Sequence, residues 1–142
     1  MKKELTRNQL QEKSLFAIYA ILTYADMNEE VDVKSLVSGL TEENYEDSDP
    51  YIKAIIINVI KHMGEIIPVY NKNMRKWTFD RLNRVEQAIL LLSYCQYFYV
   101  DKDVDKGVVI DVAVKLAKTY LDATDYKFVN AILDKVLTRE SA

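Results

Sequence analysis

The side chains that most often carry catalysis or hold metal ions are scarce in this sequence. His62 is the only histidine and Cys95 the only cysteine among 142 residues. These two residues cannot supply the several histidine and cysteine ligands of a zinc site. The glycines at positions 39, 64 and 107 are isolated, so they form no glycine-rich phosphate loop. We therefore expect no metal site, no other cofactor and no catalytic residues.

Carboxylates gather in one polar loop, TEENYEDSD, which spans residues 41–49. Catalytic acids need burial or charged neighbours that shift their pKa values, whereas five acids in a polar loop are typical of a solvated surface. The loop is therefore interpreted as acidic surface. Together with the scarcity of histidine and cysteine, it favours a binding protein over an enzyme.

The segment YKFVNAILDKV, residues 126–136, points to binding chemistry. At 100° per residue its aliphatic side chains form one narrow helical face, and Phe128 lies about 90° from the centre of that face. An aromatic side chain in this position either packs at the edge of the core or offers its ring to a ligand. The residues that form the aliphatic face are Val129, Ile132, Leu133 and Val136.

The composition predicts one globular domain. Hydrophobic residues make up 49% of the chain and charged residues 29%, and this length supports a well-buried core. Cys95 lies in an apolar run and has no disulfide partner within the chain, which fits a reducing compartment. The start, MKKELTRNQLQEK, lacks the apolar stretch of a signal peptide, and no apolar run nears the roughly 18 residues of a membrane span. These features predict a cytoplasmic protein with no membrane contact.

The net charge of −3 is unevenly distributed along the chain. Residues 1–70 carry 7 Lys and Arg against 12 Asp and Glu, whereas residues 71–142 carry 12 against 10. Nucleic-acid binders usually have a basic patch, and the best local candidate is NKNMRKWTFDRLNR at residues 71–84. The default interpretation of such a run is a solvated charged segment.

Helical spacing of apolar residues recurs almost throughout the chain. Three glycines and two prolines are too few for a sheet protein with many tight turns, and no segment alternates at period two over enough residues to form a strand. The sequence therefore predicts an all-α fold of about seven helices. The expected helices cover residues 6–25, 33–39, 50–64 and 67–75, a segment after Asn83, a segment from about Val109 to Tyr120, and a last segment after Thr124.

Local signals place the ends of these helices. Asn83 and Glu86 have the spacing of a capping box, in which each side chain bonds the other residue's backbone N–H. Gly64 is expected to end the third helix. The expected N-cap residues are Thr6, Asp49, Asn83 and Thr124.

The second half contains, in this order, the segments WTFDRLNRVEQAILLLSY, VIDVAVKLAKTY and ATDYKFVNAILDKV. In order and spacing these segments resemble the bacterial transcription antitermination factors of the NusB family. The most specific piece is KFVNAILDKV, which differs from the family's form chiefly at Ala131, where the family has glycine. In the first half, QEKSLFAIYAIL looks like the first family helix with Tyr19 at its tyrosine, whereas residues 25–75 match only in helix pattern.

The resemblance implies a fold of two three-helix bundles within one domain, residues 1–142. The N-terminal sub-bundle would cover about residues 1–65 and the C-terminal one about residues 66–142. It also implies an RNA-binding function. NusB-like proteins pair with NusE, a ribosomal protein of the small subunit, and together they hold the single-stranded boxA element of ribosomal RNA transcripts in the transcription elongation complex.

The resemblance also implies site residues. An aromatic ring at the position of Phe128 can stack an unpaired base, and Lys127 can meet a phosphate. Tyr120 is a candidate for a second stacking platform. The expected RNA-binding residues are Lys2, Lys3, Arg7, Lys13, Tyr120, Lys127 and Phe128. The expected NusE-binding residues are Tyr19, Asp80 and Glu86, although Glu86 also has capping-box spacing.

One departure from the family pattern keeps a second function open. The family's first helix usually begins with an arginine cluster, whereas TRNQLQEK here leaves Arg7 and Lys13, with Lys2 and Lys3 just upstream. Fewer phosphate contacts lower the affinity for RNA and its dependence on salt. The alternative is a divergent NusB-like module that binds NusE or forms a homodimer and has little affinity for RNA.

Overall fold

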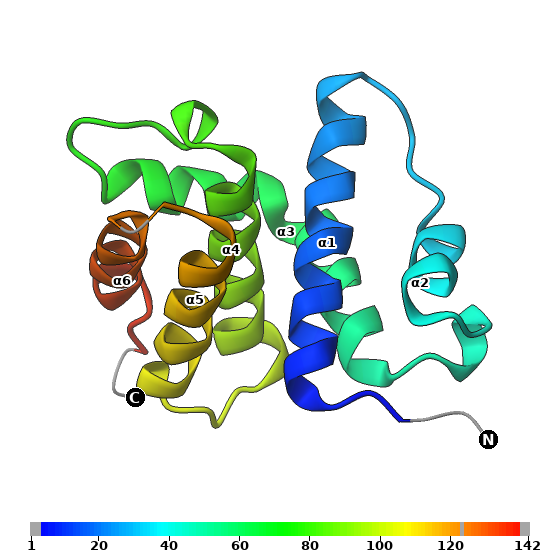
Figure 1. The fold of residues 1–142 in the computed structure, drawn as a ribbon. Coiled ribbons are helices and arrows are strands. Elements are labelled where there is room, and N and C mark those ends of the chain that lie inside the picture. The colour runs from blue at the N-terminus through cyan, green and yellow to red at the C-terminus, as the bar shows by residue number, and fades with distance from the viewer. Residues whose placement is uncertain (1–3, 123, 140–142) are drawn as a thin grey trace.

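The computed structural model describes residues 4–122 and 124–139, and in this part of the chain it contains six α-helices and no strand (Figure 1). The prediction of an all-α fold is confirmed. The helices are α1 (Arg7–Asp26), α2 (Val33–Thr41), α3 (Pro50–Lys72), α4 (Arg84–Cys95), α5 (Lys106–Tyr120) and α6 (Asp125–Val136). Within the described residues, no helix is both long and apolar enough to cross a membrane.

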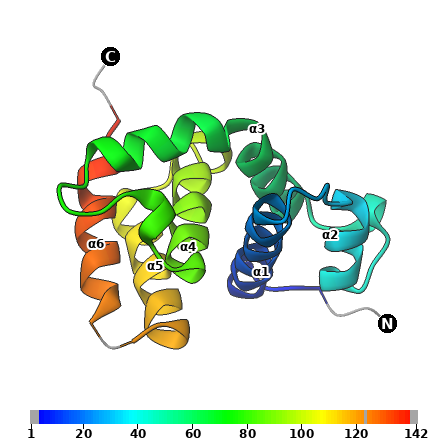
Figure 2. The same ribbon diagram turned by 90° about the horizontal axis from the view of Figure 1, so that it is seen from above.

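The helices form two groups that are joined by α3. Figures 1 and 2 show α1, α2 and the start of α3 on one side, and the end of α3 with α4, α5 and α6 on the other. Packing of α1 along α4 holds the two groups together, and α5 packs closely on α6. We propose the two groups as the two sub-bundles, with the division near residue 65 falling inside α3.

Helix α3 runs through the position where the sequence was expected to end it. The predictions that Gly64 stops the third helix and that a separate helix follows from residue 67 are wrong. Gly64 does not adopt the left-handed backbone of a helix-ending glycine, and Ile66 and Tyr70 continue the buried face beyond it. Pro68 removes the hydrogen bond to the carbonyl of Gly64 without ending the helix, and α3 bends between the two groups (Figure 2).

Most of the predicted helix starts are confirmed. In α1, Thr6 and Gln9 form a full capping box, and in α4 Asn83 and Glu86 do the same. Thr124 is an exception, because its side chain makes no capping bond and its backbone is helical rather than extended. The residues whose side chains accept a capping hydrogen bond are Thr6, Asp32, Asp49 and Asn83.

One core of buried side chains runs through both groups and draws residues from all six helices. The side chain of Tyr70 is fully buried, and its hydroxyl donates a 2.6 Å hydrogen bond to the carbonyl of Leu90. Cys95 is buried at the end of α4, as its apolar neighbours predicted, and this burial raises the pKa of its thiol to about 12. After Cys95 the chain continues as a π-helical segment, Gln96–Val100.

Candidate nucleic-acid interface

The first turn of α6 borders a surface hollow of about 390 Å³, called the Phe128 hollow below. Its other walls come from the loop before α4 and from the first turn of α4. Lys127, the residue before Phe128 in the chain, is exposed but does not line the hollow. The residues that line the hollow are Trp77, Arg81, Leu82, Asn83, Glu86, Asp125 and Phe128.

Phe128 lies in a position that is compatible with both interpretations of its place on the helix. Val129 and Ile132 are buried, which confirms the predicted inner face of α6. Phe128 is half-buried, packs against the edge of this core and also lines the hollow. Its contact with RNA stays a prediction.

Tyr120, the second predicted platform, is fixed at the end of α5 by α1. Its hydroxyl donates a 2.6 Å hydrogen bond to Glu12 Oε2, and its ring meets Phe16 edge to face, with 5.6 Å between the ring centres. The carboxylate acceptor raises the pKa of Tyr120 to about 12, so the hydroxyl keeps its proton at neutral pH. The ring is 38% exposed, but it does not line the Phe128 hollow.

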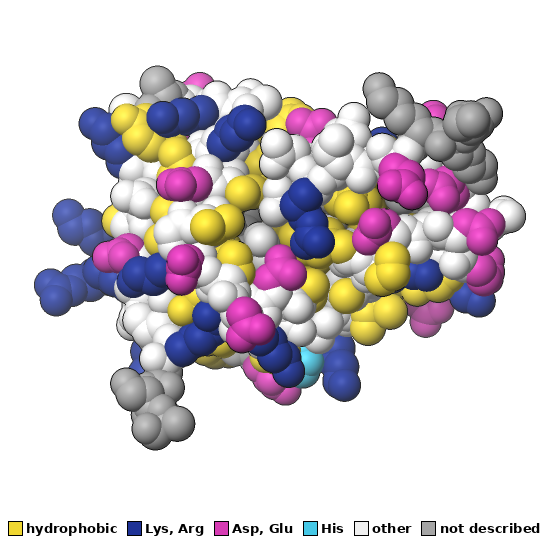
Figure 3. All heavy atoms as spheres, turned by 90° about the horizontal axis from the view of Figure 1, so that it is seen from below, with side chains coloured by type: hydrophobic (Ala, Val, Ile, Leu, Met, Phe, Trp, Pro, Cys, Tyr) yellow, Lys and Arg dark blue, Asp and Glu magenta, His cyan; other side chains and the backbone are white. Residues whose placement is uncertain are grey.

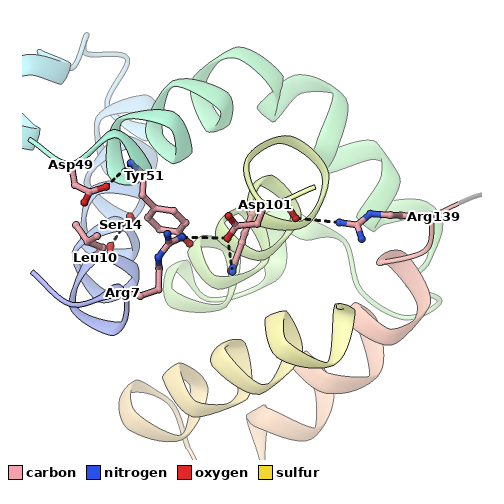
Figure 4. A network of polar contacts seen from close by, with 8 residues as sticks. Arg7, Leu10, Ser14, Asp49, Tyr51, Asp101 and Arg139 are labelled. Atoms are coloured by element: carbon pink, nitrogen blue, oxygen red, sulfur yellow. Dashed lines mark hydrogen bonds and ion pairs between the residues drawn. The ribbon is translucent and has the colours of Figure 1, made fainter. Parts of the chain in front are cut away.

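Arg7 is held by an ion pair and by an aromatic ring (Figure 4). Its Nη1 donates to Asp101 Oδ2 at 3.3 Å, and its guanidinium lies 4.0 Å from the centre of the Tyr51 ring. Asp101 is itself fixed, because Gln96 donates to its carboxylate and Arg139 to its carbonyl. The Arg7 side chain is still 54% exposed, so a phosphate can reach it only in competition with Asp101.

Of the three other basic residues predicted to bind RNA in the N-terminal region, the structure describes only one. The Lys13 ammonium donates a 2.7 Å hydrogen bond to the carbonyl of Leu40, in the last turn of α2. Its charge therefore stabilises the C-terminal end of that helix. Lys2 and Lys3 lie outside the described residues. Contacts of Lys13, Lys2 and Lys3 with RNA stay predictions.

Two of the three predicted partner-binding residues are exposed. The Tyr19 ring is 42% exposed on α1, and the guanidinium of Arg84 lies 5.7 Å from its centre. Arg84 also donates to the Thr23 hydroxyl and pairs with Asp26, so it ties the start of α4 to the end of α1. Asp80 is exposed and accepts a hydrogen bond from the Thr78 hydroxyl.

Glu86 is placed differently from the expected charged surface residue. Its side chain is buried, and Oε1 accepts a 3.3 Å hydrogen bond from the backbone N–H of Asn83, which confirms the capping-box alternative. Burial raises the pKa of Glu86, the Asn83 N–H partly opposes the shift, and the nearby charge of Asp125 adds to it. A contact between Glu86 and a protein partner stays a prediction.

On the face that Figure 3 shows, the distribution of charge follows the asymmetry of the sequence. In Figure 3, Asp and Glu side chains gather toward the side of α2 and the acidic loop, and Lys and Arg are more frequent on the side of the C-terminal helices. The negative phosphates of a nucleic acid would therefore be repelled less by the side that carries α6.

Comparison with known proteins decides the family. A model of the NusB family matches residues 8–138. This chain belongs to the NusB family. The transcription antitermination protein NusB of Finegoldia magna is 31% identical over 137 residues, which cover 96% of each chain. The NusB of Treponema denticola is 39% identical over 101 residues, which cover 70% of this chain and 74% of the relative.

Solved structures agree with the NusB assignment. A solved structure of T. maritima NusB has a TM-score of 0.78 at 22% identity, and the match covers 99% of this chain and 96% of that one, which shows the shared fold. A complex of the antitermination factors NusB and NusE with double-stranded RNA has a TM-score of 0.73 at 25% identity. The match covers 92% of this chain and 95% of the matched chain of the complex.

The structure adds two residues to the candidate site of this NusB-family protein. Trp77 is 53% exposed, and it lines the Phe128 hollow together with Arg81. Both belong to the basic segment 71–84, whose default interpretation was a solvated surface. The aromatic residue inside that basic run was the available signal, because aromatic and basic residues together are typical of single-strand binding surfaces.

Proposed function

We propose that this chain is an RNA-binding transcription antitermination factor of the cytoplasm. It binds boxA-type single-stranded RNA of ribosomal RNA transcripts together with NusE, within the transcription elongation complex. The observation that carries the proposal is the family match over residues 8–138, combined with the position of Lys127 and Phe128 on the first turn of α6. The solved complex of NusB and NusE with double-stranded RNA supports NusE and RNA as partners.

The physical chemistry of the α6 start suits this function. Stacking of an unpaired base on an aromatic ring contributes about 1–3 kcal/mol, and Phe128 packs against the core and lines the hollow. The exposed ammonium of Lys127 and the positive end of the α6 dipole favour a phosphate nearby. The protein needs no bond-making chemistry for this role, only a defined surface for RNA and partner.

One observation favours the second function, a protein-interaction module with little RNA affinity. The two described cations of the N-terminal region, Arg7 and Lys13, already have protein partners in Asp101 and the Leu40 carbonyl. RNA would have to replace these contacts, which reduces the net binding free energy from each phosphate contact. Such a module would bind NusE or a second copy of itself. Sedimentation velocity of the purified protein with and without NusE tests the homodimer.

Fluorescence anisotropy of a labelled boxA-like single-stranded RNA separates the two functions. We expect binding that strengthens when NusE is added and weakens with salt, by roughly 0.7 unit of log affinity per unit of log salt for each phosphate contact. Titrations at two salt concentrations measure this slope. If a folded sample binds NusE but not RNA, the antitermination proposal is wrong and the interaction module is the better account.

Association with NusE should depend on Tyr19. Tyr19→Ala removes an exposed ring and is expected to weaken NusE binding at least about fivefold, the effect of losing roughly 1 kcal/mol at an interface anchor. The matched control is Tyr24→Ala, because Tyr24 lies on the same helix and is similarly exposed, 37% against 42%. Isothermal titration calorimetry measures both variants. Equal affinities of Tyr19→Ala and wild type would remove Tyr19 from the interface.

A further inference from the structure

The two capping boxes of this chain show that the cap at the start of α4 does not require a negative charge. In α1 the third helical residue, Gln9, accepts the N-cap N–H of Thr6 through an amide oxygen at 2.8 Å. Glu86 performs the same task for Asn83 through one carboxylate oxygen. Glutamine and glutamate serve equally in this motif. The charge of Glu86 is therefore additional to its capping role.

The surroundings of Glu86 disfavour its negative charge. Glu86 is 8% exposed, and both its burial and the carboxylate of Asp125 raise its pKa. Among the described residues, its second oxygen, Oε2, has no hydrogen-bond donor. Oε2 is not among the buried side-chain atoms that lack a partner, so it is accessible at the hollow, where a ligand that donates hydrogen bonds can bind it.

The other residues that line the Phe128 hollow restrict the chemical nature of this ligand. Trp77 and Phe128 offer aromatic surface to a flat group. Arg81 disfavours a second cation, such as a partner's arginine, but suits the phosphate that accompanies a nucleotide. The hollow of about 390 Å³ has room for a nucleobase. A flat, uncharged group that bears adjacent N–H donors, and that is accompanied by a phosphate, matches all of these lining residues.

We infer that the Phe128 hollow binds an unpaired guanine of the RNA, whose Watson–Crick edge donates to Glu86 while its ring stacks on Trp77 and Phe128. Guanine carries two adjacent N–H donors on this edge, which match a carboxylate, whereas adenine presents one donor beside an acceptor. Glu86 and Trp77 thereby become residues that select the base. This inference rests on the proposed function, because it names the base that the RNA surface prefers.

The test uses 12-nucleotide oligouridines that carry one central guanine or one central adenine. Anisotropy of the labelled oligonucleotides should show about tenfold tighter binding of the guanine form by the wild-type protein. Trp77 is the only tryptophan, so its fluorescence reports directly on the hollow, and unlabelled guanine oligonucleotide should quench it. Glu86→Gln preserves the cap and should reduce the preference to less than about twofold. Glu29→Gln, an exposed charge-matched control, should keep the preference.

A second variant tests the same hollow independently of any effect that Glu86→Gln has on folding. Trp77→Ala changes an exposed side chain, and it should weaken the guanine oligonucleotide about fivefold or more by removing one stacking surface. Binding of both oligonucleotides with equal affinity and no change in Trp77 fluorescence would overturn the guanine site and leave the antitermination proposal standing. A response of Trp77 to NusE alone and never to RNA would also overturn it, since the occupant would then be protein. Absence of binding both to these oligonucleotides and to boxA-like RNA in the presence of NusE would end both proposals.

Discussion

Replacing Ile132 with alanine is expected to lower the free energy of unfolding by about 2–5 kcal/mol. Ile132 lies at the centre of the inner face of α6 and is only 4% exposed, and α6 packs against α5 along this face. Alanine removes the buried aliphatic atoms and leaves a cavity that the neighbouring helices can close only in part. Urea unfolding followed by circular dichroism measures the loss as a lower midpoint at an unchanged slope.

The same substitution at an exposed site gives the matched control. Ile57 lies on α3 and is 48% exposed, so Ile57→Ala should change the stability by no more than about 0.5 kcal/mol. A wild-type midpoint for Ile132→Ala would show that α6 is rotated relative to the described structure. It would then place a different set of side chains, Phe128 included, on the outer surface.

The fold could be predicted where local signals and burial agree. The period of α6 identified its buried face, and the capping box at Asn83 and Glu86 identified the start of α4. The prediction failed in α3, where a glycine and a proline lie within one continuous helix. Both residues weaken a helix locally, but Ile66 and Tyr70 beyond them are buried, and tertiary packing outweighs these local costs.

The site could be predicted only in part. The resemblance to the NusB family indicated Lys127, which is exposed, and Phe128, which is half-buried and lines the hollow. The residues around Phe128 could not be predicted from the sequence. Trp77 and Glu86 line the same hollow but lie some 40 to 50 positions away in the chain. Periodicity describes one helix at a time, so it could not show that the loop before α4 and the start of α6 share a hollow.

Replacing Phe128 should weaken RNA binding more than it weakens the fold. Phe128→Ala is expected to reduce affinity for single-stranded RNA by about 1–3 kcal/mol, roughly 5- to 150-fold, because one stacked base loses its platform. Phe128 is half-buried at the edge of the core, so the loss of stability should be smaller than that of Ile132→Ala. Phe128→Leu keeps apolar packing without a ring face, and it should lose most of the same affinity.

Tyr126 provides a control on the same turn of α6. It is also a half-buried aromatic residue, but the ammonium of Lys118 lies 4.6 Å from the centre of its ring. Tyr126→Leu should therefore leave RNA affinity within about twofold of wild type. Anisotropy titrations of the three variants, each with its thermal unfolding midpoint, separate the two roles. Wild-type RNA affinity in Phe128→Leu, with a large drop in the midpoint, would assign the ring to core packing alone and move the RNA surface away from the start of α6.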